Sequence, residues 1–278
     1  MEPTMKAQIS AVIITFNEEA RIERCLRSLD WVDEIIVVDS FSTDRTVELC
    51  RRYTDKVYQH PWPNSYARQR TIASQYAAHE WHLSLDADEV VTKALRDEII
   101  EAVNASRDIA AFRIPRREYF AGKWIKAGGW YPQYKTILFR RSSGAWEKPI
   151  HEEFIVQGKQ SPLKNPILHD GYGDFKLFMQ KFNHYSSLEA ERNFTTHHPR
   201  SVNLWKALFK PLERFYGRFI RHRGYRDGIH GFYMAAVIAI NYFLTEMKVY
   251  ELICQEEGKR DWDVEYRRSA VGADAEGK

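Results

Sequence analysis

Two short apolar runs near the amino terminus constrain the fold of this 278-residue chain more than any other feature. Residues 8–16 read QISAVIITF, and residues 34–39 read EIIVVD. Both runs are continuously apolar rather than alternating, which is typical of strands that are buried on both faces of a parallel sheet. Residues 18–29 lie between them and repeat apolar side chains at helical spacing. The first segment of the chain is therefore predicted to be a strand, a helix and a second strand.

The same alternation continues beyond residue 39. We expect a helical stretch ending near Tyr53, a short strand at residues 56–58, a helix at residues 64–79 and a strand at residues 81–85. This order predicts an α/β fold with a doubly wound, Rossmann-like, mostly parallel sheet over residues 1–105. Ligands of such sheets bind at the carboxyl ends of the strands. The polar residues that follow each strand are therefore the first candidates for a site.

Residues 106–173 are predicted to form a second half of the same domain. Strands are expected at residues 110–115 and 136–140, with short extended pieces at residues 150–170. The segment between the two strands is aromatic and rich in glycine, and we expect residues 119–131 to form a loop over a pocket. Stacking of its aromatic rings on sugar faces and packing on the core are equally compatible with this composition.

The remainder of the chain is predicted to be helical. We divide the chain into a catalytic domain at residues 1–173, a helical region at residues 174–268 and a disordered tail at residues 269–278. The longest apolar run of the helical region covers residues 232–244, which is shorter than the ~20 residues that span a bilayer. This run is expected to form a buried helix or a segment in a membrane interface.

Charge and cysteine content exclude several classes of protein. Lys and Arg number 41 against 38 Asp and Glu, a net charge of +3, whereas a dedicated nucleic-acid binder is usually far more basic. The cysteines, Cys25, Cys50 and Cys254, form no CxxC pair, which argues against a zinc site or a disulfide scaffold and favours a reducing compartment. Residues 1–8 show no export signal, so we expect a cytoplasmic protein.

The Asp86-Ala87-Asp88 motif directly follows the strand expected at residues 81–85. Two carboxylates separated by one residue can approach one divalent cation together, and oxygen ligands suit Mg²⁺ or Mn²⁺. Such a cation neutralises the charge on a departing phosphate. The structural alternative is that Asp88 caps a helix that begins near Thr92.

Polar residues also follow the first two strands. Asp39, with Ser40 after it, is placed to accept hydrogen bonds from a ribose or a base, and the alternative is a turn-forming role. The first strand ends in the sequence Thr15-Phe16-Asn17-Glu18, which could line a nucleoside pocket. Glu18 could equally be a favourable charge in the first turn of a helix. The Gly-x-Gly-x-x-Gly pattern of a dinucleotide site is missing from the sequence.

Two further groups of charged residues are candidates for the functional site. His151-Glu152-Glu153 offers a general base or an additional metal ligand, and the alternative is an acidic surface turn. Position 155 is Ile, which excludes the zinc-protease motif. Arg68 and Arg70 could face a diphosphate, although such residues more often form a solvated helix face.

A row of basic residues in the helical region shares one helix face because its members are three or four residues apart. They are Lys206, Lys210, Arg214, Arg218 and Arg221. Trp205 and four apolar residues, Leu208, Leu212, Phe215 and Phe219, are expected on the opposite side. A basic amphipathic helix is typical of a segment that binds a membrane surface. The alternative is a helix that packs on the catalytic domain with its basic face in water.

These motifs together resemble the family 2 glycosyltransferases of the GT-A fold. The matching pieces are AVIITFNEE, VVDSFSTDRT, YARQR and LSLDADE, in the order in which the family has them. KPIHEEF and the carboxyl-terminal stretch RHRGYRDGIHGFYMAAVIAINYFLTEMKVYE are similar to one branch of the family, the bacterial lipopolysaccharide core glucosyltransferases of the WaaE/KdtX type. The resemblance covers most of the chain.

The resemblance implies roles for individual residues. It implies that Asp39 binds the uracil or ribose of a UDP-sugar, that Asp88 ligates Mg²⁺ or Mn²⁺, and that Glu152 is the general base, with Glu153 as its rival. His151 would orient that base or join the metal ligands. Many members carry a separate Glu-Asp base motif where this chain has His-Glu-Glu, which leaves the base open. The implied donor site comprises Thr15, Phe16, Asn17, Glu18, Ser40, Arg68, Asp86 and Ala87, with Asp86 at the ribose or the metal.

The expected function follows from that resemblance. It is an inverting, metal-dependent transfer of a sugar, by resemblance glucose, from a UDP-sugar to a lipid-linked acceptor such as the lipid A–core of lipopolysaccharide. We expect the enzyme to lie peripherally on the cytoplasmic face of the inner membrane, bound to anionic lipid and not to nucleic acid. The alternatives are a polyprenyl-phosphate carrier or another surface polysaccharide precursor as acceptor, or a non-catalytic sugar- or membrane-binding module. A dehalogenase-like phosphatase is discounted because its Asp-x-Asp motif ends the first strand.

Overall fold

The computed structural model divides the chain into two compact units, residues 1–175 and residues 176–278, and each unit is described by itself. The residues that it describes are 7–105, 108–148, 152–171, 173 and 175–256. The sequence-based boundary at residue 173 lies close to the division between the two units.

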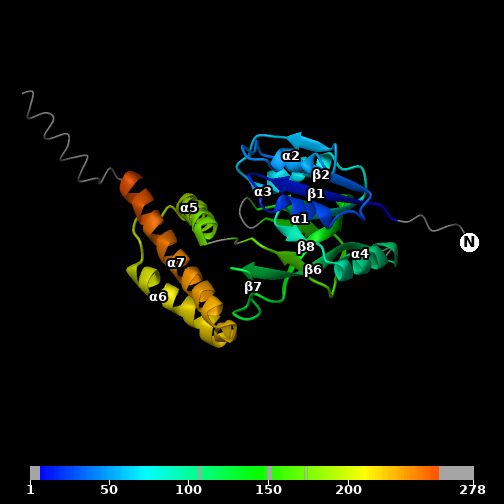
Figure 1. Ribbon diagram of the computed structural model, residues 1–278. Helices are drawn as coiled ribbons and strands as arrows, with labels where there is room; N and C mark the ends of the chain where they lie inside the picture. Colours follow the sequence, from blue (N-terminus) through cyan, green and yellow to red (C-terminus); the bar gives the residue numbers. More distant parts are fainter. Residues whose placement is uncertain (1–6, 106–107, 149–151, 172, 174, 257–278) are drawn as a thin grey trace, which may run out of the picture. The chain divides into compact units, whose positions relative to one another are not determined.

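The amino-terminal unit is built around four parallel strands in the order β3-β2-β1-β4 (Figure 1). Their apolar side chains are buried nearly throughout, as the continuous runs in the sequence predict. The pairing places Thr15 beside Asp39, and Ile14 beside Asp86, at the same edge of the sheet. The strands are β1 (Ile9–Thr15), β2 (Glu34–Asp39), β3 (Val57–Gln59) and β4 (Trp81–Asp86).

Helices cover both faces of this sheet. The core on one face joins Leu26 of α1, Leu49 of α2 and Ile99 of α4 to the sheet, whereas Ala73 of α3 packs on Val12 and its neighbours on the other face. This arrangement confirms the predicted doubly wound α/β fold. The four helices are α1 (Ile22–Arg27), α2 (Thr46–Cys50), α3 (Tyr66–Gln75) and α4 (Lys93–Ala105).

The sheet continues with strands of mixed direction, in the full order β3-β2-β1-β4-β8-β6-β12-β5. Strand β8 (Gln133–Arg140) is antiparallel to β4 and to β6 (Ile109–Phe120). Strand β12 (Ile167–His169) is parallel to β6, and its other edge pairs with β5 (Glu89–Val90). The register of that last pair places His169 beside Glu89, so β12 carries residues from late in the chain to the acidic motif that follows β4.

The remaining strands of this unit are short. The predicted loop at residues 119–131 is partly wrong, because β7 (Lys123–Trp124) pairs with the end of β6 as a hairpin. Ile125 and Trp130 of the same segment are buried, so packing accounts for part of its apolar content. Strand β11 (Lys159–Pro162) pairs with β6, whereas β9 (Gly144–Glu147) and β10 (Glu153–Val156) form a separate hairpin.

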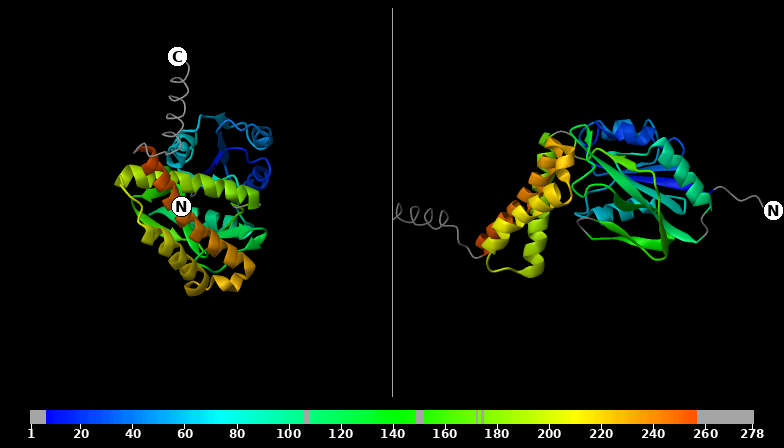
Figure 2. Two further views of the ribbon diagram at one scale, coloured as in Figure 1. Left: turned by 90° about the vertical axis from the view of Figure 1, so that its left-hand side faces the viewer. Right: turned by 90° about the horizontal axis from the view of Figure 1, so that it is seen from below.

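In the described part of the carboxyl-terminal unit, the α-helices are α5 (Phe175–His197), α6 (Leu204–Tyr216) and α7 (Ile229–Glu256) (Figure 2). Phe232 of α7 contacts the rings of Phe215 and Phe219 at centroid distances of 5.6 and 5.7 Å. A π-helical turn, Gly217–Arg221, and a 3-10 turn, Gly224–Asp227, connect α6 to α7. Helix α7 is long and apolar enough to cross a membrane by length and composition alone. The apolar run expected from the sequence, residues 232–244, lies within this helix.

Candidate active site

The loops after β1 and β2 are joined by hydrogen bonds at the carboxyl edge of the sheet. The main-chain N–H of Ser40 donates to the carbonyl of Thr15 at 2.9 Å. Asn17 donates its N–H to the hydroxyl of Ser42 at 2.8 Å and accepts one from Thr43 at 2.8 Å. Because these residues bond to one another, the predicted nucleoside-binding segments form one connected surface.

Asp39 stabilises this surface through hydrogen bonds. Its carboxylate is fully buried and accepts hydrogen bonds from the Ser42 N–H at 2.8 Å, from the Ser42 hydroxyl and from the Gln59 amide at 3.1 Å. The turn-forming role weighed in the sequence is therefore present. A direct contact of Asp39 with a base or ribose stays a prediction.

Two aromatic side chains are exposed at the same edge. Phe16 and Phe41 stand on the two joined loops and are 55% and 52% exposed. Phe41 has a φ of 62°, and Asn17 has a φ of 52°, both in the left-handed region. That region is unfavourable for a bulky side chain such as phenylalanine, so the joined loops hold Phe41 in a strained conformation.

Arg70 lies at the centre of the polar groups beside Asp86. Its side chain is buried, and it donates to Asp86 Oδ1 at 2.5 Å, to Ser84 Oγ at 3.0 Å and to Glu152 Oε1 at 3.1 Å. The guanidinium also lies 5.0 Å from the centre of the Trp146 ring. Burial alone disfavours the cation, yet Asp86 and Glu152 outweigh it and raise the pKa of Arg70 above its ordinary value. The cluster therefore keeps a permanent positive charge between two carboxylates.

Arg68, and not Arg70, was predicted to be a donor-site residue. The structure places these two arginines in different surroundings. Arg68 is exposed on α3, and its N–H is bonded to Ser65 Oγ at 3.3 Å. Arg70 instead shares the buried face of α3 with Ala67 and Ala73. The sequence did contain a signal for this position: Ala67, Arg70 and Ala73 are three residues apart and therefore share one helix face. An arginine on a face that packs on the core needs carboxylate partners.

Glu152 and Glu153 of the His151-Glu152-Glu153 motif have different surroundings. Glu152 reaches the cluster through Arg70, and its side chain is 18% exposed. Glu153 begins β10, is 55% exposed and pairs with Lys148 Nζ at 2.6 Å. His151 lies outside the described residues, so its predicted roles at the base and the metal stay predictions.

A second group of charges lies beyond Asp86. His169 forms a short hydrogen bond of 2.5 Å between Nδ1 and Glu118 Oε2, and its Nε2 is 3.4 Å from Asp88 Oδ1. Asp88 is also 3.9 Å from Arg21 Nη1, and Arg21 pairs with Glu18 at 2.6 Å. Glu18 and Asp88 are thus connected through one arginine. The alternative of a helix cap at Asp88 is wrong, because Thr92 Oγ1 accepts the Leu95 N–H at the start of α4.

Buried charges shift the pKa values of this group in opposite directions. Burial and the neighbouring Asp86 raise the pKa of Glu89 to about 7. Burial disfavours the imidazolium of His169, yet Asp88 and Glu118 outweigh it and raise its pKa to about 10. Strong shifts of this kind are typical of functional sites.

Asp86, Glu89 and His169 fit a divalent cation, whose binding would displace the proton of His169 Nε2. One ligand atom of each lies within 4.8 Å of the others, and two carboxylates with an imidazole form a donor set that suits Mn²⁺. Glu118 accepts from His169 Nδ1, the arrangement that orients a metal-binding histidine. Of the predicted ligands, Asp86 belongs to this group, whereas Asp88 is not one of the three and lies 3.4 Å from His169 Nε2; Glu89 and His169 were not predicted. Two features of the sequence could have identified them: Glu89 is a further carboxylate directly after Asp88, and His169 is a histidine at the end of a short strand.

The chain was compared with known proteins. It matches the family model described as Glycosyl transferase family 2 over residues 10–185. It is 32% identical to the lipopolysaccharide core biosynthesis glycosyltransferase LpsC of Rhizobium meliloti, over 88% of this chain and 93% of the relative. It is 47% identical to an uncharacterized glycosyltransferase of Rickettsia felis, over 90% and 92%. Among solved structures, the mannosyltransferase PcManGT of Pyrobaculum calidifontis, in complex with GDP-Man and Mn²⁺, has a TM-score of 0.55 at 14% identity, over 89% of this chain and 88% of that one.

The doubly wound sheet, with carboxylates at the ends of β2 and β4, gives the chain a GT-A-like α/β fold. The chain belongs to glycosyl transferase family 2. It is a glycosyltransferase that uses a nucleotide sugar, and the resemblance drawn from the sequence motifs is confirmed.

Proposed function

We propose that this glycosyltransferase moves a sugar from a UDP-sugar to a hydroxyl group of a lipid-linked acceptor, with inversion at the anomeric carbon. One observation carries the proposal: Arg70 holds Asp86 and Glu152 on the same guanidinium. Asp86 ends β4, where the diphosphate of a nucleotide sugar is expected, and Glu152 comes from a distant part of the chain. A donor-binding carboxylate and a candidate base are thereby brought together.

The proposed reaction is a single displacement. Glu152 accepts the proton of the acceptor hydroxyl while that oxygen forms a bond to the anomeric carbon. The bond between the anomeric carbon and the diphosphate oxygen breaks, and UDP leaves with both electrons of that bond. A divalent cation bound by Asp86, Glu89 and His169 would offset the negative charge of the departing diphosphate. Arg70 holds the base in position.

The choice of Glu152 over Glu153 rests on their contacts. Glu152 is largely sheltered and joined to the cluster of Asp86, whereas Glu153 is exposed and paired with Lys148. A base must lie within hydrogen-bond reach of the proton that it takes. Glu152 meets this condition if the acceptor binds beside Asp86.

The donor and acceptor are proposed from relatives. The name of LpsC refers to lipopolysaccharide core biosynthesis, which supports a lipid A–core acceptor. A place on the cytoplasmic face of the inner membrane is proposed together with that acceptor. UDP-glucose is the proposed donor by resemblance to the core glucosyltransferases. Transfer to a polyprenyl-phosphate carrier is the second candidate, because α7 has the length and composition of a membrane-crossing helix.

A matched pair of variants tests the proposal. Binding of UDP, GDP and ADP is measured by calorimetry with and without Mn²⁺, and transfer from UDP-glucose to lipid A–core is followed for Glu152→Gln and Glu153→Gln. We expect Mn²⁺-dependent UDP binding in all three proteins and loss of transfer in Glu152→Gln alone. Full transfer by Glu152→Gln would rule out that base, and a folded wild type that prefers another nucleotide would overturn the UDP-sugar donor.

A further inference from the structure

Helix α6 exposes a row of large apolar side chains. Leu204, Leu208, Leu212, Tyr216 and Ile220 follow one another at intervals of four residues, the last in the π-helical turn after α6, and they are between 44% and 73% exposed. Trp205 and Phe209 lie beside this row with their rings stacked at 3.7 Å. Together these seven residues are called the apolar row. Contiguous exposed apolar surface of this kind marks an interaction site.

The packing of α6 on α7 uses other residues. Ala207 is buried, and Phe215 contacts Phe232 at a centroid distance of 5.6 Å. Arg214 lies over the ring of Tyr242 at 4.8 Å. The apolar row is therefore not the face with which α6 joins its own helical unit. The sequence-based wheel, which grouped Leu208 and Leu212 with Phe215 and Phe219, combined two faces that the structure separates.

We infer that the apolar row enters the headgroup region of an anionic lipid bilayer, with α6 lying in the plane of the membrane. The inference deepens the proposed function, because it rests on an acceptor that is embedded in lipid. An interfacial helix presents leucine and aromatic side chains on one face and lysine or arginine on the other. Trp205 and Tyr216 are of the type that prefers the level of the headgroups.

The charges around the row favour lipid as the occupant. Seven Lys and Arg residues against one acid, Glu213, give residues 205–226 a net charge of +6. Lys206 and Arg221 are exposed, and Lys210 is paired with Glu213 at 2.9 Å. A second copy of the chain seated on this face would bring two equally basic surfaces together, which opposes association. An anionic leaflet instead attracts each of these cations.

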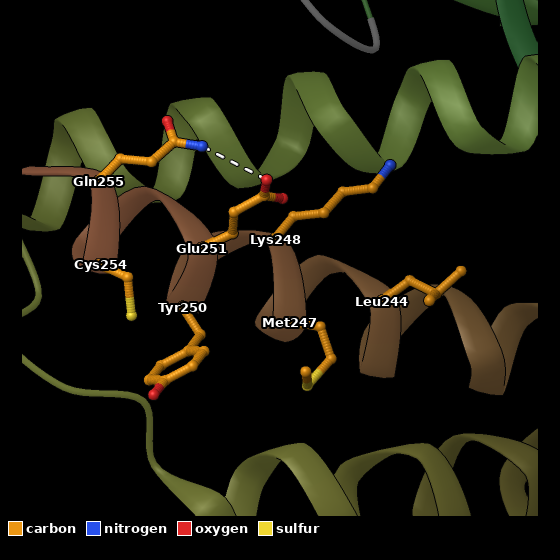
Figure 3. A pocket seen from close by; sticks show the side chains of 7 residues that line it. All are labelled: Leu244, Met247, Lys248, Tyr250, Glu251, Cys254 and Gln255. Atoms are coloured by element: carbon orange, nitrogen blue, oxygen red, sulfur yellow. Dashed lines mark hydrogen bonds between the residues drawn. The ribbon is translucent and has the colours of Figure 1, made fainter. Parts of the chain in front are cut away.

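Helix α7 also lines a pocket that has several apolar side chains (Figure 3). The pocket has a volume of about 400 Å³, and its lining includes Met247 and Tyr250. In Figure 3, Lys248 points away from these two side chains, and its Nζ donates to Ser186 and Ser187 of α5 at 2.7 and 2.8 Å. Lys248 is thus bonded within the helical unit, and Gln255 of the same lining donates to Glu251 at 3.3 Å. Insertion of the apolar row does not require this pocket.

Flotation of the full chain with vesicles tests the inference. The wild type, Leu208→Gln/Leu212→Gln and Ile155→Gln are mixed with vesicles of phosphatidylcholine alone or with phosphatidylglycerol added. Ile155 is an exposed apolar residue of β10 and serves as the matched control. We expect the wild type and the control to bind the anionic vesicles at least tenfold more tightly than the neutral ones. The double variant is expected to lose at least tenfold of that binding, at low and at high salt.

Several results would overturn the inference. Vesicle binding by the double variant that equals the wild type would exclude insertion of the apolar row. A wild-type dimer that the double variant abolishes would show that the row contacts a second copy, and wild-type protein that resists alkaline extraction from membranes would indicate a spanning helix. UDP binding by the same proteins is measured in parallel. If the wild type does not bind UDP, the proposed UDP-sugar donor is contradicted. That result does not bear on the proposed membrane contact of the apolar row.

Discussion

Asp86 and Glu152 accept hydrogen bonds from the same guanidinium group, at 2.5 and 3.1 Å, although 66 positions separate them in the chain. Arg70 donates both bonds and is itself fixed by Ser84 and by the Trp146 ring. A fork of this kind fixes both the distance and the direction between its partners, which a lysine ammonium cannot do. The geometry of the candidate base therefore depends on one residue of α3.

Arg70→Lys is expected to lower the rate of sugar transfer by about tenfold or more, because a single ammonium nitrogen must replace the planar fork of nitrogens that serves three partners. Transfer from UDP-glucose is measured together with thermal unfolding. Arg68→Lys, two residues earlier on α3 and exposed, is the matched control and is expected to retain more than half of the rate. A folded Arg70→Lys with the wild-type rate would contradict the positioning role.

Glu118→Gln is expected to weaken Mn²⁺ binding by roughly 10- to 100-fold, because Glu118 accepts the hydrogen bond that orients His169. Mn²⁺ affinity is measured by calorimetry without a nucleotide, so the readout does not require activity. Glu153→Gln, whose carboxylate lies on β10 and pairs with Lys148, is the control and is expected to leave the affinity unchanged. Equal Mn²⁺ affinities for wild type and Glu118→Gln would argue that His169 does not bind the metal.

Much of the amino-terminal half could be predicted because its signals are local. The runs that become β1 and β2 are mainly apolar and do not alternate, and the motif after β4 follows directly in sequence, so strand order and strand ends locate Asp39 and Asp86 without knowledge of tertiary contacts. The doubly wound architecture follows from the same alternation of strands and helices.

The rest of the candidate site depends on pairings between distant segments. His169 reaches the acidic motif only because the short strand β12 inserts between β6 and β5, and three residues of moderate apolarity give no such register in sequence. Arg70 differs from Arg68 only in which side of α3 the sheet covers. The apolar row of α6 was equally hidden, because helical periodicity shows that an apolar face exists and not whether a neighbour covers it.

Phe41→Gly is expected to give a more stable protein than Phe41→Ala by about 1 kcal/mol, because Phe41 occupies the left-handed region and only glycine does so without a steric cost. Urea unfolding of the two variants gives the difference in the free energy of unfolding. The same pair at Phe16, which is exposed on the neighbouring loop, is the control and should show no preference for glycine. Equal stabilities at position 41 would show that the loop relaxes to an ordinary conformation.

The buried His82 is expected to make folding stability fall at mildly acidic pH. His82 is fully buried on β4 near the ring of Phe139, and burial lowers its pKa from about 6.5 to about 4. The unfolded chain therefore binds a proton that the folded protein excludes, so the stability contribution is complete above pH 6.5 and is lost as the pH falls toward 4. Between pH 7 and pH 5 this amounts to about 1 to 2 kcal/mol.

Urea unfolding of the wild type and His82→Leu at pH 7 and pH 5 isolates this contribution. The leucine variant lacks the titrating group. Its free energy of unfolding should therefore decrease less between pH 7 and pH 5 than that of the wild type, and the difference between the two decreases should be about 1 to 2 kcal/mol. This difference does not depend on how stable the variant is at pH 7. His79→Leu, on the turn that precedes β4, is the control, because that side chain is not enclosed in the core. Parallel losses in the wild type and His82→Leu would mean that the imidazole of His82 is protonated in the folded state, and that its burial is compensated by a partner.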